Sequence, residues 1–388
     1  MKWLLVICAV AACKKQEGKP DPMAKHDAGA VTIDGMAPVV DAGAAKPAVK
    51  AVKVAVGQHT SCVLISDGTV RCWGKNDAGQ LGIGTTEDSA KPVALPLRGV
   101  KDIVLGAAHA CALLDDSSVT CWGRINVGKP DDALAPFAPG VAKASRIFAV
   151  RDAACATLDD EELVCWGDVD AKGHVRIAAK RESRAPTPAA DLKGATEIAA
   201  AGDDICVLRA DGRVACLAAK PHCTKAAPPP PKAKAKGKGK AAKRGAPKPA
   251  KPAEKPEPGL EVLPLPAAKH LAFGAGLCVI AKADGVQCLA KDGCTAESPW
   301  PGLGTVAAVD GACARLSAGS VRCWANKERA LKAVPGVKSA SAIAASSTHG
   351  CAVLSNNTVV CWGSNKHGAL GRGNADDGNY PEASAIAL

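Results

Sequence analysis

Short apolar runs alternate with turn-forming residues along most of this chain, and no segment spaces its apolar side chains as an amphipathic helix does. Many of the runs come in closely spaced pairs around a turn dipeptide, such as Asp67-Gly68 or Asp211-Gly212. Such dipeptides reach positive φ at low cost, so each pair of runs predicts a β-hairpin. We therefore expect an all-β chain.

A further strand is expected before every hairpin, and proline-marked stretches such as Pro92–Pro96 lie between the units. The strands expected before the hairpins are Val52–Val56, Ile103–Leu105, Ile147–Val150, Ile198–Ala200, Leu271–Phe273, Val306–Val309 and Ala342–Ala344. Each unit then has three or four short strands, which cannot bury both faces of a sheet without a neighbour. The units are therefore expected to pack on one another.

The spacing of the cysteines gives the number of these units. Pairs of cysteines ten residues apart occur seven times: Cys62 and Cys72, Cys111 and Cys121, Cys155 and Cys165, Cys206 and Cys216, Cys278 and Cys288, Cys313 and Cys323, and Cys351 and Cys361. The two cysteines of a pair are equidistant from the turn and face each other across the hairpin, at a separation that suits a disulfide. Zinc is the alternative, but the chain has no Cys-x-x-Cys sequence, and a tight hairpin suits direct bonding better than a tetrahedral site.

Seven repeated units predict a closed seven-bladed β-propeller over residues 51–388, with blades of three to four strands that leave only short sheet edges. An open solenoid is the alternative. The C-terminal stretch Pro381–Leu388 matches the stretch around Pro92, and we expect it to supply the missing strand beside the first unit. Such a strand would close the ring.

The residues after the second cysteine of a unit carry a family resemblance. Trp73 opens the sequence WGKNDAGQLG in unit one, and Trp362 opens WGSNKHGALG in unit seven. Both resemble the repeat of the regulator of chromosome condensation family, whose members form seven-bladed β-propellers. The resemblance weakens in units two to six. It implies a fold rather than an activity, because propellers host many unrelated functions.

Eighteen cysteines indicate an oxidising compartment, since so many thiols do not suit a reducing cytoplasm. Two cysteines outside the pairs, Cys223 and Cys294, follow units four and five at similar distances. They either bond to each other between neighbouring blades or stay as two free thiols. The last two, Cys8 and Cys13, lie in the N-terminal segment.

The N-terminus resembles a bacterial lipoprotein signal peptide. An apolar run after Lys2 ends in Val10-Ala-Ala-Cys13, which resembles the lipobox, and the run is too short to cross a bilayer. By that resemblance residues 1–12 are removed, and Cys13 becomes a diacylated N-terminus that anchors the protein to a membrane. An ordinary secretory signal or a short buried helix is the alternative. No aspartate follows Cys13, so we expect the outer membrane.

Two stretches are expected to be disordered. Residues 13–50 are rich in Lys, Asp, Ala, Gly and Pro, which predicts a lipidated flexible tether. The insertion 224–259 holds eleven Lys or Arg and two Glu, so its net charge of +9 supplies most of the +11 of the chain. We expect it to project between blades four and five, either as a solvated loop or as an arm for an anionic polymer. It lacks aromatic residues, so specific nucleic-acid recognition is not expected.

The sequence offers no catalytic set. His59, His109 and His349 lie two or three residues before the first cysteine of a unit, and this recurrence predicts structural side chains bonded to neighbouring backbone. The acidic pairs lie beside turns or strand starts, which predicts turn capping rather than acid–base catalysis: Asp115-Asp116, Asp159-Asp160 and Asp203-Asp204. Phosphate-loop and nucleophile-elbow sequences are absent. We expect neither an enzyme, nor a cofactor, nor a bound metal.

These observations favour a non-enzymatic, lipid-anchored binding scaffold of the bacterial cell envelope, which contacts a protein or glycan through propeller loops. The resembling fold also occurs in a secreted inhibitor of β-lactamase, so an inhibitor of an envelope enzyme is the first alternative. A nucleotide-exchange regulator of a GTPase is disfavoured by the export signal and the paired cysteines. An envelope hydrolase is disfavoured because no acid pair marks a recognisable site.

Overall fold

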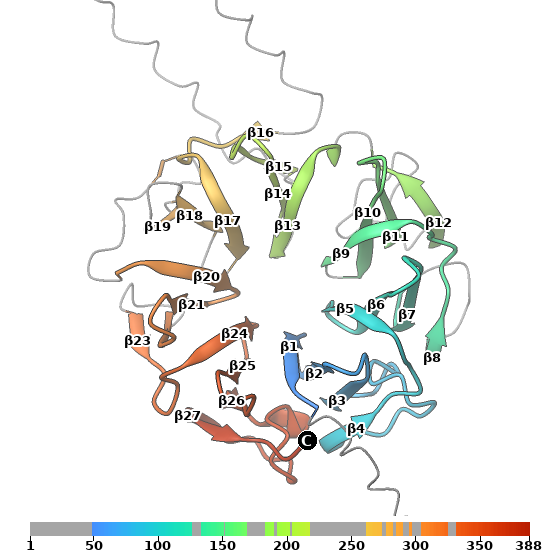
Figure 1. The fold of residues 1–388 in the computed structure, drawn as a ribbon, viewed down its shortest axis with the longest axis vertical. Helices are drawn as coiled ribbons and strands as arrows, with labels where there is room; N and C mark the ends of the chain where they lie inside the picture. Colours follow the sequence, from blue (N-terminus) through green and yellow to red (C-terminus); the bar gives the residue numbers. More distant parts are fainter. Residues whose placement is uncertain are drawn as a thin grey trace, which may run out of the picture. The chain divides into compact units, whose positions relative to one another are not determined.

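The computed structural model describes residues 49–388 except 126–132, 151, 169–182, 190–191, 202–203, 218–260, 274–276, 282–284, 290–294, 297–303 and 325–330. Seven antiparallel sheets form the blades of a ring (Figure 1). The chain is therefore a seven-bladed β-propeller, as predicted. No helix within the described residues is long and apolar enough to cross a membrane. The predicted signal peptide and tether, Cys13, Cys223, Cys294 and the insertion 224–259 lie outside the described residues.

Each blade is built from consecutive strands, with the first strand nearest the centre of the ring (Figure 1). Blades one to three contain β1 (Ala51–Val56), β2 (Thr60–Ile65), β3 (Val70–Gly74), β4 (Ser89–Ala94); β5 (Val100–Leu105), β6 (His109–Leu114), β7 (Val119–Gly123), β8 (Ala133–Phe137); β9 (Ala144–Val150), β10 (Ala153–Leu158), β11 (Leu163–Asp168) and β12 (Ser183–Pro188). Blades four and five contain β13 (Ala195–Ala201), β14 (Asp204–Arg209), β15 (Val214–Leu217), β16 (Glu261–Val262); β17 (Ala268–Phe273), β18 (Leu277–Ala281) and β19 (Val286–Cys288). Blades six and seven contain β20 (Val306–Asp310), β21 (Cys313–Leu316), β22 (Val321–Trp324), β23 (Leu331–Ala333); β24 (Ala340–Ala345), β25 (His349–Leu354), β26 (Val359–Ser364) and β27 (Asn379–Ala385).

The seven strands expected before the hairpins are confirmed, and six of them begin further upstream than the apolar runs suggest. The cause is a β-bulge near the start of every first strand, such as the extra residue between Ala195 and Glu197 in β13. A bulge interrupts the alternation of side chains, so the apolar run begins only after it. In β13 the bulge residue is Thr196, whose hydroxyl donates to the carbonyl of Leu208 at 3.0 Å.

Among its described residues, each hairpin turn holds one residue in the left-handed region that turn chemistry predicts. Gly68 has φ 74° and Asn357 has φ 67°, while Ser117 and Glu161 adopt the same conformation without being glycine or asparagine. The amides of Gly68 and Ile65 close a turn with one bulged residue, which fixes the register of the two strands.

That register places the two cysteines of every pair directly opposite each other, and the structure contains the seven predicted disulfides, one in each blade. Their Cα atoms lie 4.0–4.1 Å apart, as in a non-hydrogen-bonded pair of antiparallel strands. In blade order the bonds join Cys62 to Cys72, Cys111 to Cys121, Cys155 to Cys165, Cys206 to Cys216, Cys278 to Cys288, Cys313 to Cys323, and Cys351 to Cys361. Most of these cysteines are completely buried. The disulfides are therefore part of the core rather than surface links.

The core lies between the blades. Among the described residues, seven clusters of buried residues are found, and each joins the strands of two neighbouring blades. Most of their members are Ala, Val, Leu and disulfide cysteines, with a tryptophan in five of the seven clusters. Small side chains give little apolar area per residue, so the disulfides supply rigidity that large aromatic groups provide elsewhere.

The expected position of the C-terminal strand is wrong. The segment matching Pro92 is β27, and it pairs with β26 as the outer strand of blade seven rather than with blade one. Blade one already has its own outer strand, β4, which contains Pro92. The ring is closed by side chains instead, because Val54 and Trp73 of blade one share a buried cluster with Val353 and Leu370 of blade seven.

The expected position of the basic insertion is also wrong. Strands β15 and β16 flank it, and both belong to blade four, where Ala215 pairs with Val262. The insertion therefore connects the third and fourth strands of one blade rather than two blades. The sequence misled because β16 is only two residues long and gives no readable apolar run.

Candidate functional site

The two faces of the ring carry different kinds of connection. Because neighbouring strands are antiparallel, successive connections emerge on opposite faces. One face, here called the hairpin face, carries the tight turns between second and third strands, such as residues 66–69. The other, here called the long-loop face, carries the connections between third and fourth strands, which include the described residues 75–88 and 365–378. Long loops on a rigid scaffold are where binding residues concentrate, so the long-loop face is the candidate functional surface.

Buried asparagines shape two of these loops. The side chain of Asn76 donates to the carbonyls of Thr85 and Glu87, both at 2.9 Å, and accepts the amide of Leu81 at 2.8 Å. Asn365 has the same role in blade seven, where it donates to the carbonyl of Asn374 at 3.0 Å. One amide side chain thus replaces the backbone partners that a loop lacks. This explains why the resembling sequences of units one and seven share an asparagine.

Each of these loops docks on the next blade around the ring. The indole N–H of Trp122 in blade two donates to the carbonyl of Gln80 in the loop of blade one, at 2.9 Å. The indole of Trp73 in blade one makes the equivalent bond to the carbonyl of Ala369 in the loop of blade seven, also at 2.9 Å. Gly82 lies against the ring of Trp122, where a Cβ atom would meet the indole at 2.7 Å. The repeat sequence therefore encodes contact between blades.

A serine–histidine pair lies at the junction of blades seven and one. Ser61 Oγ and His349 Nε2 are 2.7 Å apart, and the Ser61 hydroxyl also lies 3.2 Å from the carbonyl of Ala369. The hydroxyl of Ser61 thus lies between the ring of His349 and the carbonyl of Ala369, and the tautomer of His349 sets which partner donates in the Ser61–His349 bond. Both side chains are buried. Nucleophilic catalysis needs an accessible hydroxyl, and the hydroxyl of Ser61 is buried.

The protonation of His349 follows from its place in the core. Burial, with a smaller contribution from the charge of His59, lowers the pKa of His349 to about 3. Burial likewise lowers the pKa of His109, at the same repeat position, to about 4. The expectation that these histidines bond neighbouring backbone is wrong for His349, since its Nε2 bonds a side chain of the next blade. Both rings are neutral parts of the core.

Two other histidines lie together at the long-loop face of the same junction. His59 follows β1 of blade one, and His367 belongs to the 3₁₀ turn η2 (Lys366–Gly368) of blade seven. Their ring centroids are 5.5 Å apart. Nδ1 of His367 lies 2.6 Å from Asp88 Oδ2 of blade one. Burial, followed by the charges of His367, Lys366 and Lys75, lowers the pKa of His59.

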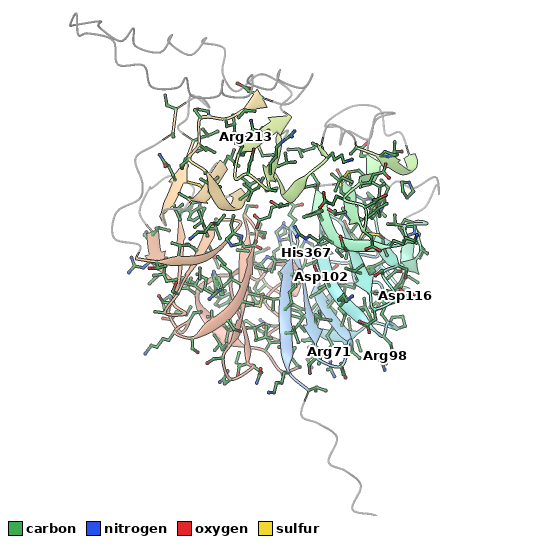
Figure 2. The ribbon with its side chains drawn as sticks, turned by 45° about the horizontal axis from the view of Figure 1, so that its top comes forward. Arg71, Arg98, Asp102, Asp116, Arg213 and His367 are labelled. Carbon is green, nitrogen blue, oxygen red and sulfur yellow. A yellow bond between two sulfur atoms is a disulfide. The ribbon has the colours of Figure 1, made fainter. Side chains whose placement is uncertain are left out.

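The inner strands carry a repeated charge pattern that the sequence analysis missed. Five titratable side chains occupy one strand position in blades one to five, and their signs alternate when His270 is protonated: Lys53, Asp102, Arg146, Glu197 and His270. Lys53 bonds Asp102, and His270 Nδ1 lies 2.6 Å from Glu197 Oε1. Asp102 lies toward the middle of the propeller, whereas Asp116 and Arg213 of the hairpin turns lie at its periphery (Figure 2). These pairs join the inner strands of neighbouring blades.

The acidic pairs of the sequence analysis are found at turns. Asp116 Oδ1 accepts both the amide and the hydroxyl of Ser118, at 2.9 and 2.6 Å, and Asp160 accepts the amide of Glu162 at 3.1 Å. Asp203 lies outside the described residues. Within the part of the chain that the structure describes, no group of three or more His, Cys, Asp or Glu side chains is placed to hold a metal ion.

The fold and the contacts made by the repeat sequence define the class of this protein. It is a β-propeller with a disulfide in each blade, and its loop motifs bond the next blade around the ring. The sequence profile of the regulator of chromosome condensation (RCC1) repeat matches residues 67–113, and a second profile of that repeat matches residues 51–80, 100–127 and 340–369. Residues 51–127 and 340–369 therefore contain RCC1-type repeats. The matched segments lie in blades one, two and seven, where the loops and tryptophans described above are found.

Solved structures from several organisms match this chain. Yeast RCC1 (Prp20) bound to Kap60 is 16% identical over 87% of this chain and 75% of that chain, with a TM-score of 0.47. The ectodomain of the Physcomitrella patens receptor kinase CR4 is 16% identical over 81% and 74%, with a TM-score of 0.49. Human WBSCR16 is 18% identical over 87% and 82%, with a TM-score of 0.43. No curated protein matches the chain in sequence.

Proposed function

We propose that this protein is a non-enzymatic binding scaffold of the bacterial cell envelope, anchored through a lipid on Cys13, whose long-loop face contacts a protein or glycan. The observation that carries the proposal is the buried disulfide in each of the seven blades. Seven such bonds need an oxidising compartment, and the lipobox-like end of the N-terminal apolar run supplies a route out of the cytoplasm.

A binding role suits the way the blades are built. Asn76 and Asn365 fix the loops that carry them, and the disulfides fix the strands beneath those loops. Rigid loops lose little conformational entropy when a partner binds, which favours affinity. The surrounding histidine and serine side chains serve packing between blades, so the described residues give recognition more support than catalysis.

The basic insertion adds a second contact to this proposal. Strands β15 and β16 come directly before and after it in blade four, so we expect it to leave the ring on the long-loop face. A net charge of +9 over residues 224–259 attracts an anionic polymer, such as the phosphates of lipopolysaccharide, an acidic polysaccharide or extracellular DNA. This attraction is independent of sequence and weakens with salt.

Photo-crosslinking in intact cells tests which face binds. We expect a photoreactive amino acid at Gln58 or Lys366, both exposed on the long-loop face, to give discrete adducts of higher mass. The matched controls are Asp116 and Asn356, which are equally exposed on the hairpin face and should give none. If the adducts contain one soluble enzyme, and that enzyme has lost its activity in the adduct, the inhibitor alternative is favoured. Adducts confined to the hairpin face would contradict the proposal.

A further inference from the structure

We propose that His59 and His367 form a binding site for a divalent transition-metal ion such as Zn²⁺, which bridges blades seven and one on the long-loop face. Each histidine comes from a different end of the folded chain, so the ion would tie the first blade to the last. The site goes beyond the binding role proposed above and does not depend on it.

The separation of the two rings suits a shared ion. Zinc binds imidazole nitrogen at about 2.0–2.1 Å, so two imidazoles on one tetrahedral ion hold their ring centroids roughly 5–6 Å apart. The centroids of His59 and His367 are 5.5 Å apart with a tilt of 52° between the ring planes, so the rings are not stacked on each other. Nδ1 of His59 is buried and has no hydrogen-bond partner among the described residues.

A carboxylate orients the second ring. Nδ1–H of His367 donates to Asp88 Oδ2 at 2.6 Å, which leaves the lone pair of Nε2 free to bind an ion. Asp88 is itself held, because its Oδ1 accepts the amide of Asn76 at 2.7 Å. A carboxylate behind a histidine fixes the tautomer and raises the basicity of the ligand, as in many metal sites.

The backbone at His367 supports the same assignment. His367 adopts φ 60° and ψ 15°, a left-handed conformation that is unfavourable for a residue other than glycine. The equivalent residue of blade one is Ala78, which is completely buried and not left-handed. The strained backbone of blade seven therefore occurs at the residue whose imidazole lies beside His59.

The chemistry of the pair selects the ion. Neutral imidazole binds borderline ions such as Zn²⁺, Cu²⁺ and Ni²⁺, whereas Mg²⁺ and Ca²⁺ prefer oxygen. Two protein ligands leave the remaining positions to water, and the ammonium groups of Lys75 and Lys366 lie near His59. We therefore expect an exchangeable site, weaker than a four-ligand structural zinc site.

Titration of the full-length protein with Zn²⁺ alone tests the site. The protein is kept oxidised and its free thiols are alkylated first, so that only the histidines are offered. We expect a single Zn²⁺ to bind per chain, Mg²⁺ not to bind, and His59→Ala or His367→Ala each to weaken binding at least about tenfold. The matched control is His270→Ala, which removes another histidine paired with a carboxylate and should leave Zn²⁺ binding unchanged.

A spectroscopic readout separates ligation from indirect effects. With Cu²⁺ as the probe, electron paramagnetic resonance should show coupling to two imidazole nitrogens in the wild type and to one in either single variant. The proposal is overturned if the wild type takes up no Zn²⁺ at concentrations up to roughly 1 mM, or if both single variants, shown to be folded by their melting curves, bind it as the wild type does.

Discussion

Reduction of the seven hairpin disulfides is expected to unfold the propeller. Each disulfide joins residues ten positions apart, and a loop of that size is worth about 2.7 kcal/mol in the loop-entropy description. Seven such terms together exceed the roughly 5–15 kcal/mol by which a typical folded domain is stable. Reduction also removes cross-strand packing from the core, because the cysteines are members of the clusters between blades.

Thermal unfolding followed by circular dichroism measures this effect. The oxidised protein should show a cooperative transition, and the protein that has been reduced in denaturant, alkylated and returned to native buffer should show none. A single-pair variant, with Cys62 and Cys72 both changed to alanine, should lose about 2–4 kcal/mol and stay folded. A reduced and alkylated chain that melts at the same temperature as the oxidised one would contradict the role given to the disulfides.

Acid is expected to destabilise the protein through its two buried histidines. The pKa of His349 falls to about 3 and that of His109 to about 4 because both rings are buried. In the unfolded chain both rings take up protons below about pH 6.5, while in the folded chain they stay neutral until lower pH. Stability is therefore full above the unfolded pKa and falls as the pH drops from about 6.5 toward 4, by about 1.4 kcal/mol per pH unit for each histidine.

Two other groups oppose this trend. Hydrogen bonding to Glu197 raises the pKa of His270, so its contribution to stability is full at low pH and is lost as the pH rises through that pKa. Burial raises the pKa of Asp310 to about 6, so its burial becomes less unfavourable as the pH falls through that value. The net slope of the wild type is thus smaller than two histidines alone would give.

Comparison of variants with the wild type measures the contribution of His349 to the pH dependence of stability. We expect urea unfolding of His349→Gln to show a shallower loss of stability between about pH 6.5 and 4 than the wild type, because the amide of glutamine can donate to or accept from Ser61 without taking up a proton. His270→Gln should change the slope in the opposite direction. An identical dependence on pH in the wild type and His349→Gln would show that His349 is not buried as a neutral ring.

Repetition made the architecture predictable. Cysteine spacing gave the number of blades, the register of each hairpin and the disulfides, because these depend on residues close in sequence. The sheet that an outer strand joins was harder to predict, because it depends on residues far apart in the sequence. The insertion 224–259 and the strand β27 were misplaced, since the two-residue strand β16 and a C-terminal strand carry no signal for which sheet they join.

The contacts between blades were missed for a similar reason. The bond between Ser61 and His349 joins residues 288 positions apart, and the sequence around either residue carries no signal for the other. The inner-strand charges were readable in principle, because Lys53, Asp102, Arg146 and Glu197 each precede the first cysteine of their unit by nine residues. Alignment of the units on their cysteines would have revealed this alternation of sign.

The intact mass of the protein extracted from the membrane fraction, alkylated with and without prior reduction, tests the central claim most directly. The account predicts a chain that lacks residues 1–12, carries the added mass of acyl chains, and alkylates at the seven hairpin pairs only after reduction. A full-length chain without acyl mass, alkylated at those cysteines without any reductant, would contradict both the lipid anchor and the oxidising compartment.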